Sequence, residues 1–158
     1  SVYACVGGGD SAAIALAIMQ KKPPGCGYTG TTMVTVADPN AAYTTAPSYG
    51  VSFDYATPTP VFVAVSMGNA SCVPSDALTQ VQAAVAAAFD GTDGGTRARI
   101  ASRLYASRFY AGIAGLGAWA QIVEITIGTP ALPTGFPVQM DINQAPTLDP
   151  DDITLALV

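Results

Sequence analysis

Apolar residues recur along this chain with two different periods, and the change from one to the other predicts its secondary structure. The first residues read as a short strand, and residues 11–22 read as a helix. The segment from Ala12 to Met19 within it is apolar on every side, which predicts a helix buried on more than one face. Asp10 is the expected N-cap, because its carboxylate can accept hydrogen bonds from the free N–H groups of the first turn.

Two further strands complete the first half of the chain. The stretches "TTMVTVAD" (31–38) and "YGVSFDYA" (49–56) both read as strands. Thr57-Pro58-Thr59-Pro60 follows, and its two prolines favour extended backbone at a boundary between lobes. The predicted lobes are therefore residues 1–58 and 59–158.

The second half opens on "VFVAVSM" (61–67), a strand whose alternate residues share one face. A helix is expected from about Asp76, with Ser75 as its N-cap and Gly91 at its end. It carries an apolar stripe at helical spacing. The residues of that stripe are Leu78, Val81, Val85 and Phe89.

A second helix is expected from about Arg97 to Ala111, with Thr96 as its cap, and three strands follow it. The strands are "WAQIVEITIG", "FPVQMDI" and "DDITLALV". The element order is β-α-β-(β) followed by β-α-α-β-β-β, which lacks the regular alternation of a fully parallel sheet. The expected fold class is α+β, with two small lobes, each an antiparallel or mixed sheet packed with Ala-rich helices.

The composition points towards contacts with other proteins. Only 11% of the residues are charged and 50% are hydrophobic, whereas a charged share of about 25% is usual. A neutral, apolar-rich surface favours protein partners. The net charge of −5 and the lack of a long basic stripe argue against nucleic acid. No apolar run approaches the roughly 18 residues that span a bilayer, so no membrane partner is expected.

The chain contains no histidine, which excludes Ser-His-Asp and Cys-His catalysis and every metal site that uses histidine. Cys5, Cys26 and Cys72 are odd in number and widely spaced, and we expect free thiols in a protein that assembles in the cytosol. We expect no enzymatic activity and no cofactor.

The glycine cluster near the start leaves an alternative open. Gly7, Gly9 and Ala12 fit the G-x-G-x-x-G/A spacing of a dinucleotide-binding turn, and Asp38 ends the next strand, where an acidic residue can hold a ribose hydroxyl. Asp10, however, occupies the position of the pyrophosphate and repels it. We expect the three glycines to serve the backbone, at least one of them at positive φ, with no cofactor bound. The alternative is a small-molecule or nucleotide-binding α/β domain that uses the Gly7–Gly9 turn.

Two acidic segments are interpreted as turns. "DGTDGG" (90–95) lacks the Gly-Lys-Ser/Thr of a phosphate loop and the spaced acids of an EF-hand, which favours a flexible connector between helices. The acidic cluster before the last strand favours Asp side chains that bond nearby backbone over a divalent cation site. Its members are Asp149, Asp151 and Asp152, with Asp141.

Four of the six basic residues lie between Arg97 and Arg108. On the predicted helix, two arginines are neighbours at i, i+4, and two aromatic residues share the same spacing. Arginine with tyrosine and phenylalanine is the composition of interface anchors, although ordinary packing with solvated arginines is the alternative. The candidate interface residues are Arg99, Arg103, Tyr105, Arg108 and Phe109.

Several segments in the second half, taken in order, carry a resemblance. "TPVFVAVSM", "RARIASRLYASRFYAGI", "VEITIG" and "MDINQAPTLDPDDITLAL" together resemble the C-terminal part of the baseplate J-like proteins of contractile-tailed bacteriophages. The likeness covers about Thr57 to Val158 and extends more loosely to "GGGDSAAIALAI" and "KKPPGCGYTG". It implies that residues 1–58 are a middle lobe and residues 59–158 the C-terminal lobe of such a protein, with an N-terminal portion missing here.

The resemblance implies a structural role without catalytic residues. Proteins of this family build the baseplate wedges, so the expected partners are other baseplate wedge proteins and copies of the chain itself. No nucleic acid, membrane or small-molecule ligand is expected. The expected localisation is the virion tail baseplate of a phage or prophage, assembled in the bacterial host cytoplasm. A free-standing secreted adhesion module is a further alternative.

Overall fold

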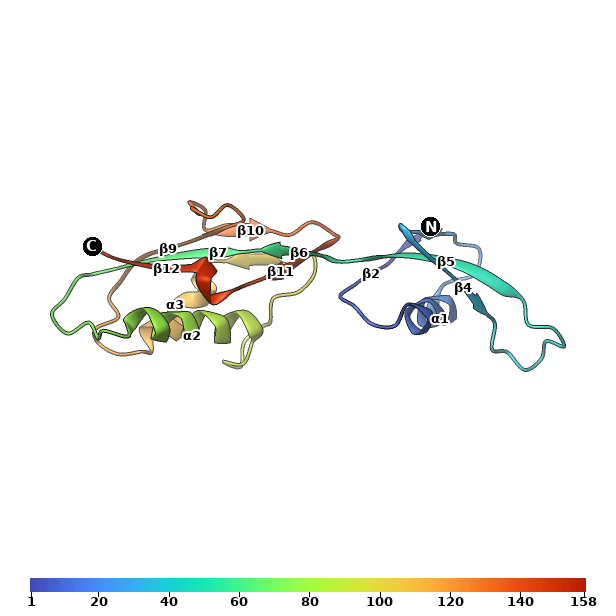
Figure 1. The fold of residues 1–158 in the computed structure, drawn as a ribbon, viewed down its shortest axis with the longest axis horizontal. Helices are drawn as coiled ribbons and strands as arrows, with labels where there is room; N and C mark the ends of the chain where they lie inside the picture. Colours follow the sequence, from blue (N-terminus) through green and yellow to red (C-terminus); the bar gives the residue numbers. More distant parts are fainter. The chain divides into compact units, whose positions relative to one another are not determined.

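The computed structural model describes residues 1–158, which divide into two compact units, Ser1–Thr57 and Pro58–Val158. We call these units the N-terminal lobe and the C-terminal lobe. The division falls inside the Thr57-Pro58-Thr59-Pro60 segment, one residue before the boundary that the sequence predicts. Each lobe combines small sheets with helices, so the predicted α+β class is confirmed (Figure 1).

The N-terminal lobe is built around the strand β5 (Ser48–Tyr55). β5 lies between β2 (Cys5–Val6), to which it runs parallel, and β4 (Thr32–Ala37), to which it runs antiparallel. The short strands β1 (Val2–Tyr3) and β3 (Tyr28–Thr29) form a separate parallel pair. Both longer strands predicted for this half are therefore present.

The helix α1 (Ser11–Lys21) packs against β4 and β5. Asp10 caps it as predicted, because its carboxylate accepts a hydrogen bond from the Ala13 N–H at 2.8 Å. The prediction that α1 is buried on more than one face is wrong. Ala15 is its only buried residue, since one small sheet covers one face of the helix and leaves the opposite apolar face exposed.

Gly30 marks the tightest backbone approach in this lobe. A Cβ atom at this position would lie 2.4 Å from the Cα atom of Phe53 on β5. Phe53 is fully buried and lies in the core with Ala15, Val36 and Val51. The chain can therefore approach the backbone of β5 this closely only because residue 30 has no side chain.

The C-terminal lobe is built around the strand β7 (Phe62–Met67). β7 pairs in parallel with β12 (Ile153–Leu157) and antiparallel with β9 (Ile122–Gly128). The predicted alternation on β7 is confirmed, because its inward-facing residues are at most 1% exposed. On β7 these residues are Val63, Val65 and Met67, and Val61, which directly precedes β7, is buried as well.

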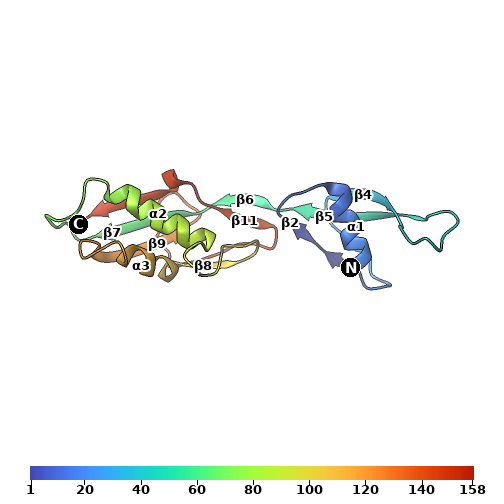
Figure 2. The ribbon, with the colours of Figure 1, turned by 90° about the horizontal axis from the view of Figure 1, so that it is seen from below.

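Two helices cover the apolar face of this sheet. α2 (Ala77–Asp90) and α3 (Ser107–Ala114) lie side by side on it, as Figure 2 shows, and their buried residues join those of β7 and β9 in one core. α2 ends, as predicted, at Gly91, whose φ of 74° lies in the left-handed region that favours glycine.

Two expectations for α2 are wrong. Asp76, rather than Ser75, is the N-cap residue, and its carboxylate accepts hydrogen bonds from the Gln80 side chain instead of capping the helix. The buried stripe is also rotated, because Leu78 is 43% exposed and small residues take its place against the sheet. The buried residues are Ala77, Val81, Val85 and Ala88.

The helix predicted from Arg97 to Ala111 is wrong as well. Residues 91–102 form turns and irregular structure, and residues 103–105 form the strand β8 (Arg103–Tyr105), so that the helix starts only with α3. Ala101 has a φ of 59°, which a right-handed helix cannot contain. β8 pairs antiparallel with β10 (Pro137–Gln139), and this pairing with a distant segment overrides the local helical propensity.

The remaining elements of this lobe are one further pair of strands and one short helix. β6 (Thr57–Pro60) pairs with β11 (Gln144–Thr147), a strand that sequence analysis did not predict. A short 3-10 helix, η1 (Pro150–Asp152), leads into β12. The predicted strands "WAQIVEITIG", "FPVQMDI" and "DDITLALV" contain β9, β10 and β12 respectively.

We expect Gly30→Ala to lower the free energy of unfolding of the N-terminal lobe by roughly 1–3 kcal/mol, the usual cost of overpacking, because the new methyl group meets rigid backbone. Gly27→Ala is the matched control, since a Cβ atom there meets nothing within 4 Å. Urea denaturation followed by circular dichroism measures both variants. Equal midpoints for the two would contradict the close approach seen in the structure.

Candidate functional site

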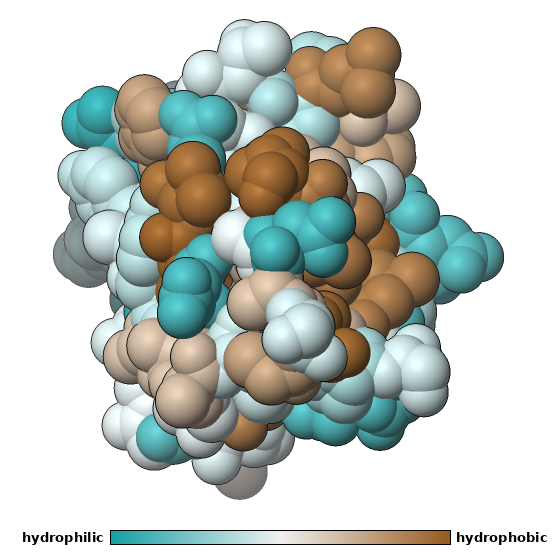
Figure 3. Space-filling model, turned by 90° about the vertical axis from the view of Figure 1, so that its left-hand side faces the viewer, coloured by the Kyte–Doolittle hydropathy of each residue, from teal (hydrophilic) through white to brown (hydrophobic).

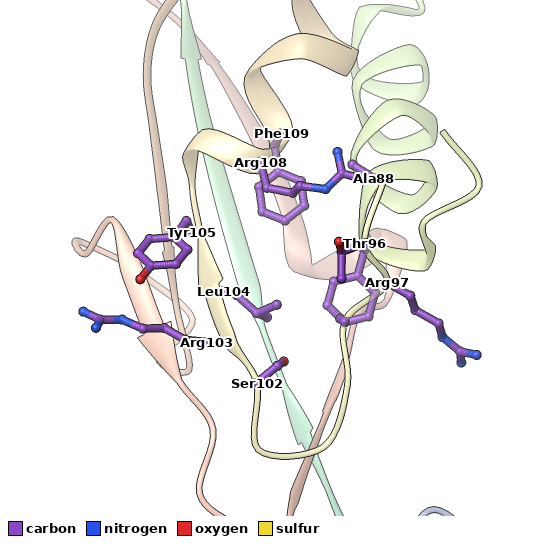
Figure 4. A pocket seen from close by; sticks show the side chains of 11 residues that line it. Ala88, Thr96, Arg97, Ser102, Arg103, Leu104, Tyr105, Arg108 and Phe109 are labelled. Carbon is purple, nitrogen blue, oxygen red and sulfur yellow. The ribbon is translucent and has the colours of Figure 1, made fainter. Parts of the chain in front are cut away.

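Most of the predicted interface residues meet at one pocket of the C-terminal lobe, although they do not share a helix. The pocket has a volume of about 220 Å³ and lies between the end of α2, residues 96–102, β8 and the start of α3 (Figure 4). We call it the arginine pocket. Its lining residues are Ala88, Phe89, Thr96, Arg97, Ala98, Ser102, Arg103, Leu104, Tyr105, Arg108 and Phe109.

The interior of the arginine pocket is apolar. Figure 4 shows Leu104 and Phe109 pointing inwards, while Arg103 and Tyr105 leave β8 on the opposite side, as the alternation of a strand requires. Phe109 is 2% exposed. It is therefore a core residue that forms a wall of the pocket, and a partner could contact it only from inside the pocket.

Arg103 and Tyr105 form an exposed pair on the outer side of β8. The guanidinium carbon of Arg103 lies 5.3 Å from the centre of the Tyr105 ring, and Tyr105 is 49% exposed. This distance is within the range of a cation–π contact. Because stacking uses the face of the guanidinium and leaves its N–H donors at the edge free, the pair can still bind a carboxylate.

Arg108 forms an ion pair with Asp93 of the same lobe. Its Nη1 donates to Oδ2 of Asp93 at 2.6 Å, and its Nη2 donates to Oδ1 of the same carboxylate. The Gly95 N–H donates to Asp93 at 3.0 Å. The hydrogen bonds from Arg108 and Gly95 lower the pKa of Asp93 to about 2.

This ion pair ties the loop after α2 to the start of α3. A Cβ atom at residue 95 would collide with the Arg108 guanidinium as it is placed here, so a side chain at this position would displace the guanidinium. The interpretation of "DGTDGG" as a flexible connector missed this contact. An aspartate between glycines, fifteen residues before an arginine, is too common a pattern to reveal the pair from sequence.

Arg99 lies outside the arginine pocket. It is exposed and begins a turn in which the Ser102 N–H donates to its carbonyl at 3.1 Å. The structure thus places Arg103, Tyr105, Arg108 and Phe109 around one pocket and leaves Arg99 apart from it.

The charge of the C-terminal lobe is distributed unevenly. All four of its basic residues lie at positions 97–108, and three of them line the arginine pocket. Only Arg108 forms an ion pair within the chain. Eight acidic residues lie elsewhere in the lobe or at the edge of this segment: Asp76, Asp90, Asp93, Glu124, Asp141, Asp149, Asp151 and Asp152.

A second hollow, of about 260 Å³, adjoins the first. It shares Phe89 and Arg97 with the arginine pocket and is also lined by Pro146 and Leu148. The two hollows together extend the concave surface from β8 to the segment that leads into η1.

The glycine turn does not have the surroundings of a nucleotide site. Gly8 and Gly9 have φ values of 139° and 121°, which confirms that at least one of the three glycines adopts positive φ. Asp38, however, follows the β4 residue paired with Ser48, whereas the turn follows the β2 residue paired with Tyr55. The two features therefore lie at opposite ends of the eight-residue β5, more than about 20 Å apart at roughly 3.3 Å per residue.

No side-chain cluster suited to a metal ion is present. Nowhere in the chain do three or more Cys, Asp or Glu side chains gather in a way that could hold a cation. The acidic cluster instead caps η1: Asp149 accepts from the Asp151 N–H at 3.1 Å, and Asp152 accepts from the Asp149 N–H at 3.4 Å. The interpretation as a turn before a strand is confirmed. None of the three helices has the length and apolar character needed to cross a bilayer.

The remaining perturbed titratable groups are structural. Asp54 on β5 accepts hydrogen bonds from the N–H and Oγ1 of Thr31, both at 2.6 Å, and these bonds lower its pKa. Burial, together with the neighbouring Asp54, raises the pKa of Tyr3 to about 12. The three cysteines are unpaired.

No protein-family model and no curated protein matches this chain.

We expect Asp93→Asn to destabilise the C-terminal lobe at neutral pH and progressively less in acid. Because the folded state holds the pKa of Asp93 near 2, below its ordinary value of 3.8, the carboxylate contributes its full stability above pH 3.8 and loses it as the pH falls towards 2. Thermal melts of wild type and variant between pH 7 and pH 2 should therefore converge.

Asp90→Asn is the matched control for this series. It removes the same charge three residues away, from a carboxylate that forms no ion pair. We expect its melting temperature to follow that of wild type across the whole range. A constant gap between Asp93→Asn and wild type down to pH 2 would contradict a structural role for the ion pair.

Proposed function

We propose that this chain is a structural part of the contractile-tail baseplate of a phage or of a prophage-derived particle. In this role the arginine pocket docks a segment of a neighbouring wedge protein. The single observation that carries the proposal is the placement of three of the four cations of an acidic lobe at one apolar pocket. A chain of such low charge has little other reason to gather its arginines.

The segments that carry the resemblance to baseplate J-like proteins also support this proposal. "VFVAVSM" contains β7, "VEITIG" lies in β9 and "ITLAL" forms β12, while "SRFYAGI" lies in α3. These four elements contribute most of the buried core of the C-terminal lobe. The resemblance therefore concerns residues that define the fold of the lobe, rather than a short surface motif.

The chemistry of the pocket indicates what the docked segment contains. An apolar interior takes a large aliphatic or aromatic side chain. Arg97 at the pocket and Arg103 on the outer side of β8 have no carboxylate partner in the chain, and they favour acidic residues where the partner segment continues past the pocket. Opposite charges accelerate encounter and select the register of docking. We therefore expect the partner segment to carry an apolar residue flanked by Asp or Glu.

Locating the protein in an assembled particle tests the proposal directly. An epitope tag is placed on the protein encoded by the gene that contains this chain, and particles are purified on a density gradient. We expect the tag to sediment with sheathed tails and gold-labelled antibody to mark the end of the tail distal to the head. Absence of the tag from sheathed particles would contradict the proposal.

We expect Arg103→Glu to block incorporation of the full protein into baseplates while leaving the chain folded. Losing one member of an interfacial charge pair costs about 2–5 kcal/mol, enough to lose an assembly contact. Arg99→Glu is the matched control, because it makes the same charge change on an exposed arginine outside the pocket and should assemble normally. Sedimentation of particles measures incorporation, and circular dichroism melting checks the fold.

Equal incorporation of Arg103→Glu and wild type would show that the Arg103 and Tyr105 pair is only a solvated face. Equal loss in both variants would contradict docking at the arginine pocket and place the contact on the wider arginine segment.

A further inference from the structure

The sheet around β7 has two edges that differ in their protection. Strand order in this sheet is β12-β7-β9, so β12 and β9 are the edge strands. Figure 2 shows β12 along one margin of the sheet with no strand beyond it. An edge strand presents unpaired N–H and C=O groups, and native proteins usually shield such an edge.

The β9 edge carries several such protective features. Glu124 places a charge on β9, the pairing of β9 with β7 contains an irregularity at Ser66 and Met67, and the Ile127 N–H donates to the Gly135 carbonyl at 2.7 Å. Residues beyond β9 therefore already use part of that edge.

The β12 edge carries no such feature. Its sequence, "ITLAL", contains no charge and no proline. Its register against β7 is unbroken, from Ile153 opposite Val63 to Leu157 opposite Met67. Because β12 has no charge, no proline and no irregularity, its outer N–H and C=O groups remain available for pairing with another strand.

Hydrogen bonds at the end of β12 identify the backbone groups that face outwards. The Val158 N–H donates to the Met67 carbonyl at 2.9 Å, and the Val158 carbonyl accepts from the Asn69 N–H at 2.8 Å. Residue 158 therefore faces the β7 side with both groups. Because this direction alternates along a strand, residues 156 and 154 also face β7, and residues 157, 155 and 153 face the open edge.

Not every outward group is free. The Ile153 N–H donates to the Pro150 carbonyl inside η1. The free donors at the open edge are thus the N–H groups of Leu155 and Leu157. The free acceptors are the carbonyls of these two residues and of Ile153.

We propose that the open edge of β12 pairs antiparallel with β12 of a second copy of this chain, joining the two sheets across a two-fold axis at Leu155. In this register, each Leu155 N–H donates to the Leu155 carbonyl of the other copy. Each Leu157 N–H donates to the Ile153 carbonyl of the other copy. The already bonded Ile153 N–H is the one outward donor that needs no new partner.

Charge selects the antiparallel arrangement. Three carboxylates, Asp149, Asp151 and Asp152, lie immediately before β12. A parallel pair would bring the carboxylates of two copies together. An antiparallel pair over five residues separates them by about 17 Å at roughly 3.4 Å per residue, beyond the Debye length of about 8 Å at physiological salt.

The exposed apolar end of β12 supports the same arrangement. Leu157 is 44% exposed and Val158 is 67% exposed. Figure 1 marks the end of the chain on the side of the molecule that Figure 3 turns to the viewer, and apolar residues gather there among polar ones. Antiparallel pairing sets Leu157 beside Ile153 of the other β12 and removes part of the apolar surface of Leu157 from water. The proposal is independent of the baseplate function and of the arginine pocket.

Charge patterning on the exposed face of β12 tests the register. Thr154 and Ala156 are exposed, and the proposed pairing sets residue 154 of one copy directly opposite residue 156 of the other. We compare the double variant Thr154→Lys/Ala156→Lys with Thr154→Glu/Ala156→Glu, each alone and in an equal mixture. Sedimentation velocity over a dilution series of the 158-residue chain is the measurement, and circular dichroism melting checks the fold.

We expect wild type to dimerise in a concentration-dependent way, each double variant to remain monomeric through like-charge repulsion, and the mixture to form heterodimers. The single variant Thr154→Lys is the matched control: it places lysine opposite alanine and should dimerise like wild type. Monomeric wild type throughout the series, double variants that dimerise like wild type, or a mixture that stays monomeric would each overturn the proposal.

A backbone variant keeps the test decisive if a double variant fails to fold. Leu157→Pro removes an outward N–H and no bond to β7, whereas Leu157→Ala shortens the same side chain and keeps that N–H. We expect Leu157→Pro to weaken the dimer by about tenfold or more relative to Leu157→Ala, because two hydrogen bonds are lost by symmetry. Equal dimer affinities for the two would overturn the proposal.

Discussion

The C-terminal lobe depends on the burial of one face of a single strand. β7 is paired on both edges, and its inward side chains, from Val61 to Met67, are shielded almost completely from water. α2 and α3 can lie on the sheet only because this face is apolar and continuous. The same arrangement decides which surfaces remain available: the ends of the two helices frame the arginine pocket, and the outer edge of β12 has no strand beside it. The proposed contacts at the arginine pocket and at the edge of β12 therefore both follow from how the helices and strands pack around β7.

Within this frame, the arginines near the pocket have different roles. Arg108 is held by Asp93 and ties the loop after α2 to the start of α3, with its guanidinium directly against Gly95. Arg103 lies on the outer side of β8 against Tyr105 and pairs with no carboxylate of the chain. A cation that builds the pocket and a cation that can meet a partner are therefore separated by only five positions. The alternation of a strand and the start of a helix send them to opposite sides.

Local sequence patterns predict an element correctly where the interaction that determines the element is itself local. The cap at Asp10, the end of α2 at Gly91 and the positive φ in the glycine cluster follow from one or two neighbouring residues, and the alternation on β7 follows from residues within one strand. The helix predicted from Arg97 to Ala111 is wrong because the structure that replaces it depends on a contact that is not local. β8 exists through pairing with β10, more than thirty residues later, and the left-handed Ala101 that precedes it has no sequence signature.

The candidate sites likewise have some features that the sequence determines and others that depend on contacts between distant segments. Composition alone showed that histidine chemistry is absent, and the order of the residues showed that the cations are concentrated in one segment. Only the tertiary structure joined that segment to α2 as an apolar pocket, since Phe89 and Leu104 approach each other through the packing of helix on sheet. It also separated Asp38 from the glycine turn by the length of β5. The sequence by itself determined which residue types are available and where helices and strands can begin or end. The distances between those residues depend on strand order and register, which arise from contacts between segments far apart in the chain.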